Sequence, residues 1–288
     1  MAFPKNGVVE APAIAPAEYG LFTVIKPSSS TNEDRWIRGF AQEWETELYA
    51  ANLWDSTDTS SDSVASNATP TRHEEIDPFF IEVEELVSTM GFLGLDRIER
   101  IKRQIDGVTQ KAIEKELWDG AIRSAENHDN KALSSASATI LNSGTALSAA
   151  RALALLDFTI ASTSPCGEQG VIHMTRDVAA LLSSSYMIFH KESHLQTVSG
   201  TPIVIGSGYS GVGPTGATGA AASATNKWMY ATGTVKVFVG KIDVVNDNLS
   251  QAYDVDGNQN DMRLKAIRPA AVYFDSSVHL AVRVDLSV

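Results

Sequence analysis

The sequence predicts an α+β protein, and three observations carry this prediction. A long amphipathic helix is expected over residues 96–120, and a second helix, rich in Ala and Leu, over residues 147–161. Short apolar segments with brief connections predict strands that pair mostly antiparallel. The 288 residues are 43% hydrophobic, so the chain can bury a substantial core in one large domain or two smaller ones.

The helix over residues 96–120 is the clearest element of the chain. Asp96 with Glu99 matches a capping box, and Gly120 supplies the stop. At a rise of about 1.5 Å per residue, the segment forms a rod of roughly 35 Å, which is long for a globular domain. Four apolar residues at spacings of three and four are expected to face the core: Ile98, Ile101, Ile105 and Val108.

The N-terminal third predicts an arm and a projecting hairpin. Residues 1–34 are rich in Pro, Ser and Ala, which predicts an extended arm that needs a partner surface to become ordered. Aromatic residues in 35–54 fit the period of a helix and of a strand equally, 55–72 are small and polar, and 79–84 alternate like a strand. Two such segments around a polar tip predict a hairpin. Because an isolated ribbon is marginal in water, the hairpin is expected to rest on another molecule.

The remaining elements are expected in the second half of the chain. A short helix is predicted over residues 176–186. Strands are predicted over 170–174, 201–205, 228–245, 270–274 and 279–286.

Composition limits the classes of function. The net charge is −12, and a nucleic-acid-binding surface is disfavoured because neutralising phosphates needs clustered Lys and Arg. The charge does not exclude a protein that encloses nucleic acid without binding it tightly. The single cysteine, Cys166, forms no internal disulfide and has no basic neighbour that would activate it. Without a signal-peptide pattern or a long apolar run, the protein is expected to be soluble and made in the cytosol.

The stretch VIGSGYSG, residues 204–211, has the glycine spacing of a dinucleotide-binding turn after a strand. That site also needs a helix at the third glycine and an acidic residue about 20 positions later. Glycines and prolines crowd residues 211–220, and no acidic residue occurs between Gly206 and Lys241. The sequence therefore predicts a strand followed by a long flexible loop. A nucleotide-dependent oxidoreductase is a remote alternative.

No segment completes a catalytic, cofactor or metal site. DVDGNQNDMRLK, residues 254–265, resembles a calcium loop but has Gln259 in place of the turn glycine and Lys265 in place of the bidentate glutamate, which favours a turn between strands. His190 and His194 lack a third ligand, and the six histidines are interpreted as surface or loop residues. The chain is therefore interpreted as a structural protein, not an enzyme, with no catalytic, cofactor-binding or metal residues.

Five stretches carry a resemblance to a known family: EKELWDG (114–120), LNSGTALSAARALALLD (141–157), GVIHMT (170–175), KWMYATGTVKVFVG (227–240) and RPAAVYFDSSVHLAVRVDL (268–286). Their order and spacing cover most of the chain from residue 79 onward. The sequence resembles tailed-bacteriophage major capsid proteins of the Hong Kong 97 type, in the versions found in phages of actinobacteria.

The resemblance implies the Hong Kong 97-like fold and its parts. These are an N-terminal arm (1–34), an E-loop (35–90), a peripheral domain with the spine helix (91–164), an axial domain (165–245) and a return to the peripheral domain (246–288). The E-loop of the family is a strand hairpin, which favours a strand over a helix for residues 36–43. The residues of the family's covalent cross-link cannot be matched, so no cross-link is carried over.

The resemblance also implies self-assembly into pentamers and hexamers of an icosahedral shell around double-stranded DNA, which is enclosed without specific binding. The protein would be made in the bacterial cytoplasm and end in the virion, with scaffolding, portal or decoration proteins as further partners and no membrane. An encapsulin-like compartment protein is the alternative. The residues expected at subunit interfaces are Trp36, Phe40, Trp54, Phe79, Phe80, Gly213 and Gly216.

Overall fold

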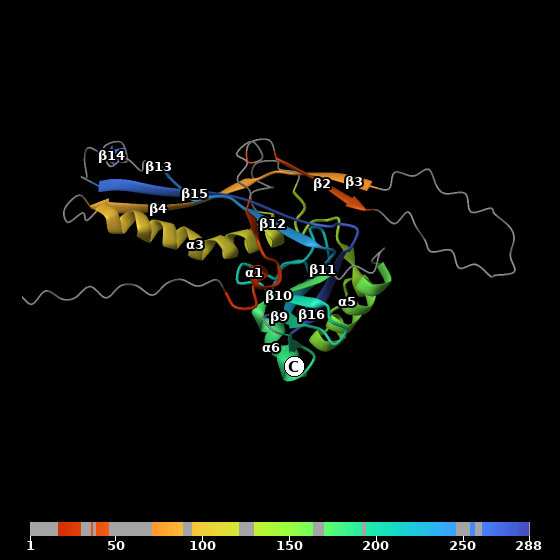
Figure 1. Ribbon diagram of the computed structural model, residues 1–288. Helices are drawn as coiled ribbons and strands as arrows, with labels where there is room; N and C mark the ends of the chain where they lie inside the picture. Colours follow the sequence, from red (N-terminus) through yellow and green to blue (C-terminus); the bar gives the residue numbers. More distant parts are fainter. Residues whose placement is uncertain are drawn as a thin grey trace, which may run out of the picture.

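The computed structural model describes residues 17–29, 36, 39–45, 71–88, 94–120, 130–163, 170–191, 194–245, 254–256 and 261–287. Within these ranges the chain forms an elongated sheet backed by one long helix and a compact lobe built on a second sheet (Figure 1). The predicted α+β class is confirmed.

The elongated sheet is organised around strand β15 (Asp261–Phe274). It pairs antiparallel with β4 (Phe79–Ser88) along the whole of β4. Strands β12 (Val235–Val239), β13 (Asp243–Val245) and β14 (Asp254–Asp256) pair with other parts of β15, and β1 (Ser28–Ser29) adds parallel to β12. The sequence analysis predicted only residues 270–274 of β15, because the likeness of 254–265 to a calcium loop assigned the first residues of the strand to a turn. The turn predicted for residues 254–265 is wrong at both ends of the segment, because 254–256 form β14 and 261–265 belong to β15, and the two strands pair with each other.

Helix α3 (Gly94–Asp119) lies along β4 and β15 and is about 39 Å long at 1.5 Å per residue (Figure 1). It begins two residues before Asp96, whose side chain lies outside the described residues, so the capping box stays a prediction. Gly120 has a φ of +61° and donates its N–H to the carbonyl oxygen of Glu116, so the predicted stop is confirmed.

The predicted core stripe of α3 is partly wrong. Ile101 and Ile105 are completely buried, and Ile98 is half-buried against the same core. Val108, however, is 38% exposed. After Ile105 the buried stripe continues at Thr109 and Ile113, at steps of four residues, and not at Val108. The second half of the helix packs against residues of the lobe as well as of the elongated sheet, which changes the face that is buried.

The compact lobe contains the second sheet, in the order β5-β16-β11-β7-β10-β9-β8, with β6 also paired to β16. Its strands are β5 (Thr139–Ile140), β6 (Leu147–Ser148), β7 (Val171–Met174), β8 (Phe189–Lys191), β9 (His194–Gln196), β10 (Pro202–Ile205), β11 (Asn226–Thr232) and β16 (His279–Asp285). Helices α5 (Ala149–Thr163) and α6 (Arg176–Ser184) pack against it through a shared core. The predicted helices and strands of this half are confirmed with shifts of their ends, except that residues 228–245 divide into three strands.

The two sheets divide the chain at points that differ from the expected domain boundaries. Strands β12 and β13, inside the expected axial domain 165–245, belong to the elongated sheet. Strand β16, inside the expected peripheral return 246–288, belongs to the sheet of the lobe. The chain therefore crosses between the sheets after β11 and again after β15.

The N-terminal segment 17–29 is packed on its own chain, contrary to the expectation for the arm. Helix α1 (Leu21–Val24) carries Leu21, which is completely buried, and β1 pairs with β12. Residues 1–16 lie outside the described residues. The predicted arm was wrong for 17–29 because the apolar residues of EYGLFTVI were too few to register as periodic.

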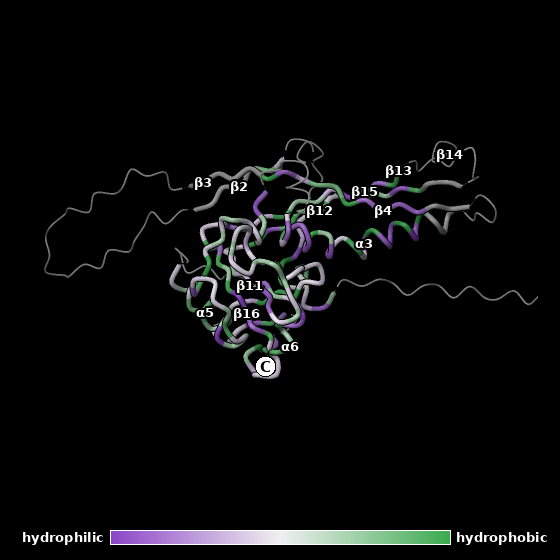
Figure 2. Tube along the Cα trace, turned by 180° about the vertical axis from the view of Figure 1, so that it is seen from behind, coloured by the Kyte–Doolittle hydropathy of each residue, from purple (hydrophilic) through white to green (hydrophobic). Residues whose placement is uncertain are grey.

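Strands β2 (Phe40–Glu45) and β3 (Thr71–Ile76) form a separate antiparallel hairpin that projects away from the lobe (Figure 1). The strand predicted for residues 36–43 is confirmed for 40–43, whereas Trp36 is helical. The polar tip lies outside the described residues. Figure 2 shows hydrophilic and hydrophobic residues alternating along α3, and a mixture of hydrophilic and hydrophobic residues over the lobe. Among the described residues, no helix has the length and apolar character needed to span a membrane.

Candidate assembly site

An aromatic cluster attaches the β2–β3 hairpin to the elongated sheet. We call it the hairpin root; its residues are Trp36, Phe40, Ile76, Phe238, Ala271 and Tyr273. The rings of Phe40 and Phe238 stack with their centroids 4.8 Å apart, and Trp36 meets Phe40 edge-on at 5.1 Å. Such a pair contributes about 0.5–1.5 kcal/mol beyond its buried area. The hairpin is therefore fixed at its base by its own subunit.

The root lies on the face of the sheet opposite α3. On β12, Val237 is buried in the main core with α3, whereas its neighbour Phe238 points to the root. The end of the other arm, at Asp77, is held by Asn130, which lies after α3 in the chain. The Asn130 Oδ1 accepts from the Asp77 N–H at 2.8 Å, and its Nδ2 donates to the Asp77 carbonyl at 2.6 Å. Asp77 lies between β3 and β4, so this pair fixes the point where the hairpin leaves the sheet.

The glycine turn of residues 206–208 binds a carboxylate of its own chain. One oxygen of the completely buried Glu114, Oε2, accepts from the N–H of Ser207 at 2.6 Å, from its hydroxyl at 3.0 Å and from the Gly208 N–H at 3.0 Å. The other, Oε1, accepts from the Leu21 N–H at 2.9 Å and from the Gln110 Nε2 at 2.8 Å. A buried carboxylate needs such charge-assisted hydrogen bonds. We call Glu114 and these partners the Glu114 junction.

The close approach of the turn to α3 explains the second glycine of the stretch. A Cβ at Gly208 would lie 2.3 Å from the Lys111 carbonyl oxygen and 2.8 Å from the Lys115 nitrogen, both in the helix backbone. The glycine spacing therefore serves helix–loop packing, and the amides that would hold a phosphate in a dinucleotide site hold Glu114 instead. Sequence reasoning missed Glu114, because nothing local to α3 indicates that its carboxylate meets a turn 93 residues away.

The loop after this turn is anchored by its own chain. The Val212 carbonyl accepts from the Trp118 indole at 3.1 Å and from the Tyr230 hydroxyl at 3.0 Å. The Gly219 carbonyl accepts from the Trp228 indole at 2.9 Å, and the Gly213 N–H bonds to the Ala220 carbonyl at 2.6 Å. The prediction of a flexible loop did not anticipate these anchors, because the donors come from distant aromatic residues.

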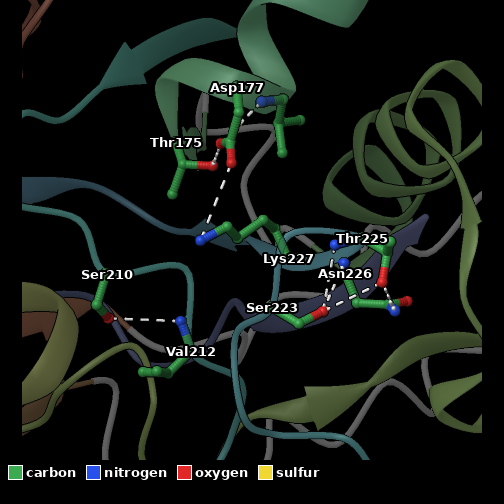
Figure 3. Close-up of polar contacts among 9 residues, drawn as sticks. Thr175, Asp177, Ser210, Val212, Ser223, Thr225, Asn226 and Lys227 are labelled. Carbon is green, nitrogen blue, oxygen red and sulfur yellow. Dashed lines mark hydrogen bonds and ion pairs between the residues drawn. The ribbon is translucent and has the colours of Figure 1, made fainter. Parts of the chain in front are cut away.

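Further polar contacts hold both ends of the loop (Figure 3). At its start, Ser210 donates to Asp119 Oδ1 at 2.5 Å. The Ser210 hydroxyl also accepts from the Val212 N–H at 3.4 Å, as Figure 3 shows. At its end, the Ser223 hydroxyl accepts from the Asn226 N–H at 3.0 Å and so caps the turn into β11. Lys227 then reaches Asp177 of α6 at 3.9 Å.

His173 and His279 are buried, so the interpretation of the histidines as surface or loop residues is wrong for these two. Thr232 Oγ1 donates to the Gly233 carbonyl and therefore accepts from His173 Nε2, at 3.1 Å. His173 Nδ1 is then the acceptor for the Tyr209 hydroxyl at 2.9 Å. His279 Nε2 donates to the Leu133 carbonyl at 3.0 Å.

These contacts leave both imidazoles neutral. Burial, assisted by the nearby His279, lowers the pKa of His173 to about 3. Burial also lowers the pKa of His279 to about 4. For the phenol of Tyr209, burial raises the pKa, so it stays a hydroxyl donor. The three groups thus act as fixed hydrogen-bonding groups of the core, not as an acid–base site.

The residues expected at subunit interfaces divide by exposure. Trp36, Phe40 and Phe79 are buried within their own subunit, and Gly213 is buried against Trp228. These four supply internal packing. Phe80 is 58% exposed and Gly216 is exposed, so for these two an interface role stays a prediction. Trp54 lies outside the described residues.

Large exposed apolar side chains also occur on the lobe, and sequence reasoning did not single them out. Phe158 is 71% exposed on α5 and Val198 is 78% exposed in the turn between β9 and β10. Asp157 holds that turn by accepting from the hydroxyls of Thr197, Ser199 and Thr201. Phe158 and Val198 are therefore held in the same part of the lobe. In the described ranges, no group of histidine, cysteine and acidic residues could hold a metal ion.

Comparison with known proteins gives a match in structure only. No family model and no curated protein matches the sequence. The capsid of an empty GTA particle covers 100% of this chain and 96% of its own, with a TM-score of 0.56 and 10% sequence identity. A chain of Microbacterium phage Oxtober96 covers 99% of this chain and 95% of its own, with a TM-score of 0.56 and 11% identity. A chain of Gordonia phage Cozz covers 98% of this chain and 91% of its own, with a TM-score of 0.55 and 11% identity.

The fold is that of phage capsid proteins. The sequence resemblance is thereby confirmed at the level of fold, over the full length of the chain.

Proposed function

We propose that this chain is a major capsid protein, whose copies assemble as pentamers and hexamers into the icosahedral head of a phage. The observation that carries the proposal is the full-length likeness to a GTA capsid, which leaves neither chain with a large unmatched part. A partial likeness would be compatible with a capsid-like domain attached to another activity. The chain would be made in the bacterial cytoplasm and end in the virion.

The two projecting features of the subunit support self-assembly. The β2–β3 hairpin is a two-stranded sheet fixed at its root, and ribbons of this kind gain stability when they lie on another surface. Exposed apolar side chains on the elongated sheet and on the lobe, such as Phe80 and Phe158, would lose contact with water in a shell. Phe80 and Gly216 are the proposed interface residues from the sequence prediction.

The charge of the chain supports enclosure of DNA without tight binding. A net charge of −12 gives no broad basic surface, so packaged double-stranded DNA would be contained by the shell and not gripped by it. Scaffolding, portal and decoration proteins are the further partners of such a shell, and no cofactor is needed.

Electron microscopy of the purified protein, expressed with its neighbouring genes, tests the proposal. We expect closed shells with five-fold and six-fold arrangements of subunits, and sedimentation of the protein as particles of many copies. Shells filled by a protein cargo in place of DNA would favour an encapsulin-like compartment. A small, homogeneous oligomer under all assembly conditions would contradict both structural proposals.

A further inference from the structure

The segment of residues 17–29, which we call the strap, contacts both α3 and the lobe. Its Leu21 N–H donates to Glu114, and the Leu21 side chain is completely buried in the main core. The carbonyl of Tyr19 accepts from the Ile205 N–H at 2.8 Å, and the Tyr19 ring meets His190 edge-on at 5.3 Å. The strap is therefore held by the Glu114 carboxylate of α3, by the backbone of β10 and by burial of Leu21 in the core. The bond to Glu114 is the charge-assisted one.

One residue of the hairpin root, Phe238, also pairs with the strap. Ser28 of the strap pairs in parallel register with Phe238 of β12. The ring of Phe238 stacks on Phe40 of the hairpin at 4.8 Å. Phe238 thus holds the strap through its backbone and the hairpin through its side chain. The strap is also covalently continuous with the hairpin through residues 30–39.

We propose that the strap and the β2–β3 hairpin are one coupled unit, fastened by Glu114 and linked through Phe238, so that release of the strap loosens the hairpin. Strand β1 is only two residues long, so its pairing with β12 depends on the rest of the strap being held in place. When the strap leaves, the backbone of Phe238 loses its partner at the edge of the sheet. The ring that supports Phe40 then gains freedom. This coupling is a property of the single subunit and does not depend on assembly.

Hydrogen exchange on unassembled subunits tests the coupling, with Glu114→Gln as the perturbing variant. The new amide group places an N–H₂ against backbone donors, so one side of the junction loses its acceptor. We expect exchange in residues 17–29, 40–45 and 71–76 to become about tenfold faster, since a hydrogen bond to a charged group contributes on the order of one factor of ten or more. Exchange in β11 should stay unchanged.

Asp157→Asn is the matched control. It removes a carboxylate that also accepts several hydrogen bonds, but these lie in the lobe, away from the strap. Neither the strap nor the hairpin should exchange faster in this variant. If Glu114→Gln fails to fold, Leu21→Ala carries the same test, because it loosens the strap and keeps the Glu114 carboxylate and its bonds to Ser207 and Gly208.

Phe238→Ala tests the link itself. On its own this variant should speed exchange in the hairpin, and adding Glu114→Gln should then speed exchange in the strap without a further effect on the hairpin. An additional hairpin effect in the double variant would place the coupling elsewhere. Faster strap exchange with an unchanged hairpin in Glu114→Gln would overturn the coupling, and unchanged strap exchange would overturn the role of Glu114 as its fastening.

Discussion

The glycine-rich loop and the β2–β3 hairpin were both expected to be held only weakly by their own chain, the loop because of its glycines and prolines and the hairpin because an isolated ribbon is marginal in water. In the structure they differ in how their own chain holds them. The loop is bonded along its length by Trp118, Trp228 and Tyr230, and its first turn by Glu114. The hairpin is attached at one end, through the aromatic root and Asn130. Composition predicts that a segment is irregular, but distant donors decide whether it is fixed.

The largest expected effect comes from the core of α3, on which the fixed loop rests. Replacing Ile101 and Ile105 together by Asp puts two carboxylates into completely buried positions. Each substitution removes about 2–3 kcal/mol of stabilisation by apolar burial and adds the cost of desolvating a carboxylate. The free energy of unfolding of a whole domain is only about 5–15 kcal/mol. We expect insoluble protein and no particles in an expression and sedimentation assay.

Val108→Asp is the control for this variant, because Val108 lies on the same helix but is 38% exposed. It should yield soluble protein and normal particles. Normal particles from the double variant would show that the helix does not carry the core.

The next effect separates two glycines of the loop region. Gly208→Ala forces a methyl group to within 2.3 Å of the α3 backbone, so the turn must move away from Glu114. We expect a loss on the order of 3 kcal/mol in the free energy of unfolding, the upper range for overpacking. Gly216 has open space but a φ of +83°, so Gly216→Ala should cost only about 1 kcal/mol. Denaturant titration of both variants measures the difference; equal losses would mean that the turn does not pack as described.

Acidification should weaken the core beneath the loop through His173 and His279. Their pKa values of about 3 and about 4 lie below the ordinary 6.5, so the unfolded state binds more protons and stability falls as the pH drops below 6.5. Between pH 7 and pH 5 we expect a loss on the order of 1–2 kcal/mol for each histidine, measured by urea titration. A pH-independent stability over that range would contradict the neutral, buried state of both rings.

The smallest effect concerns one anchor of the loop. Trp228→Phe keeps an aromatic ring in the core but removes the indole N–H that bonds the Gly219 carbonyl. The free energy of unfolding should fall by about 1 kcal/mol, and exchange should rise in residues 213–220 but not in the hairpin. A rise in the hairpin as well would show that the two regions are not independent.

The sequence predicted most elements of this fold, because helices and half-buried strands carry their own periodicity. Ile101 and Ile105 were placed correctly, whereas Val108 was not, since a helix that changes its surroundings along its length also changes its buried face. The first half of β15 was missed although residues 261–266 alternate between charged and apolar, because the Asp/Gly/Asn pattern of 254–258 favoured a turn over the whole of 254–265. The Glu114 junction and the hairpin root could not be predicted. Each joins residues that are far apart in sequence, and no local pattern indicates which distant donor meets which acceptor.

Hydrogen exchange measured on wild-type subunits and on assembled particles tests the comparison most directly. The Gly213 and Thr215 amides, bonded to Ala220 and Ser134, should be equally protected in both states, because their own chain holds them. Residues 40–45 and 71–76 should gain protection on assembly, because only their root is fixed in the single subunit. Loop amides that become protected only in particles, or hairpin amides already fully protected in free subunits, would contradict this account.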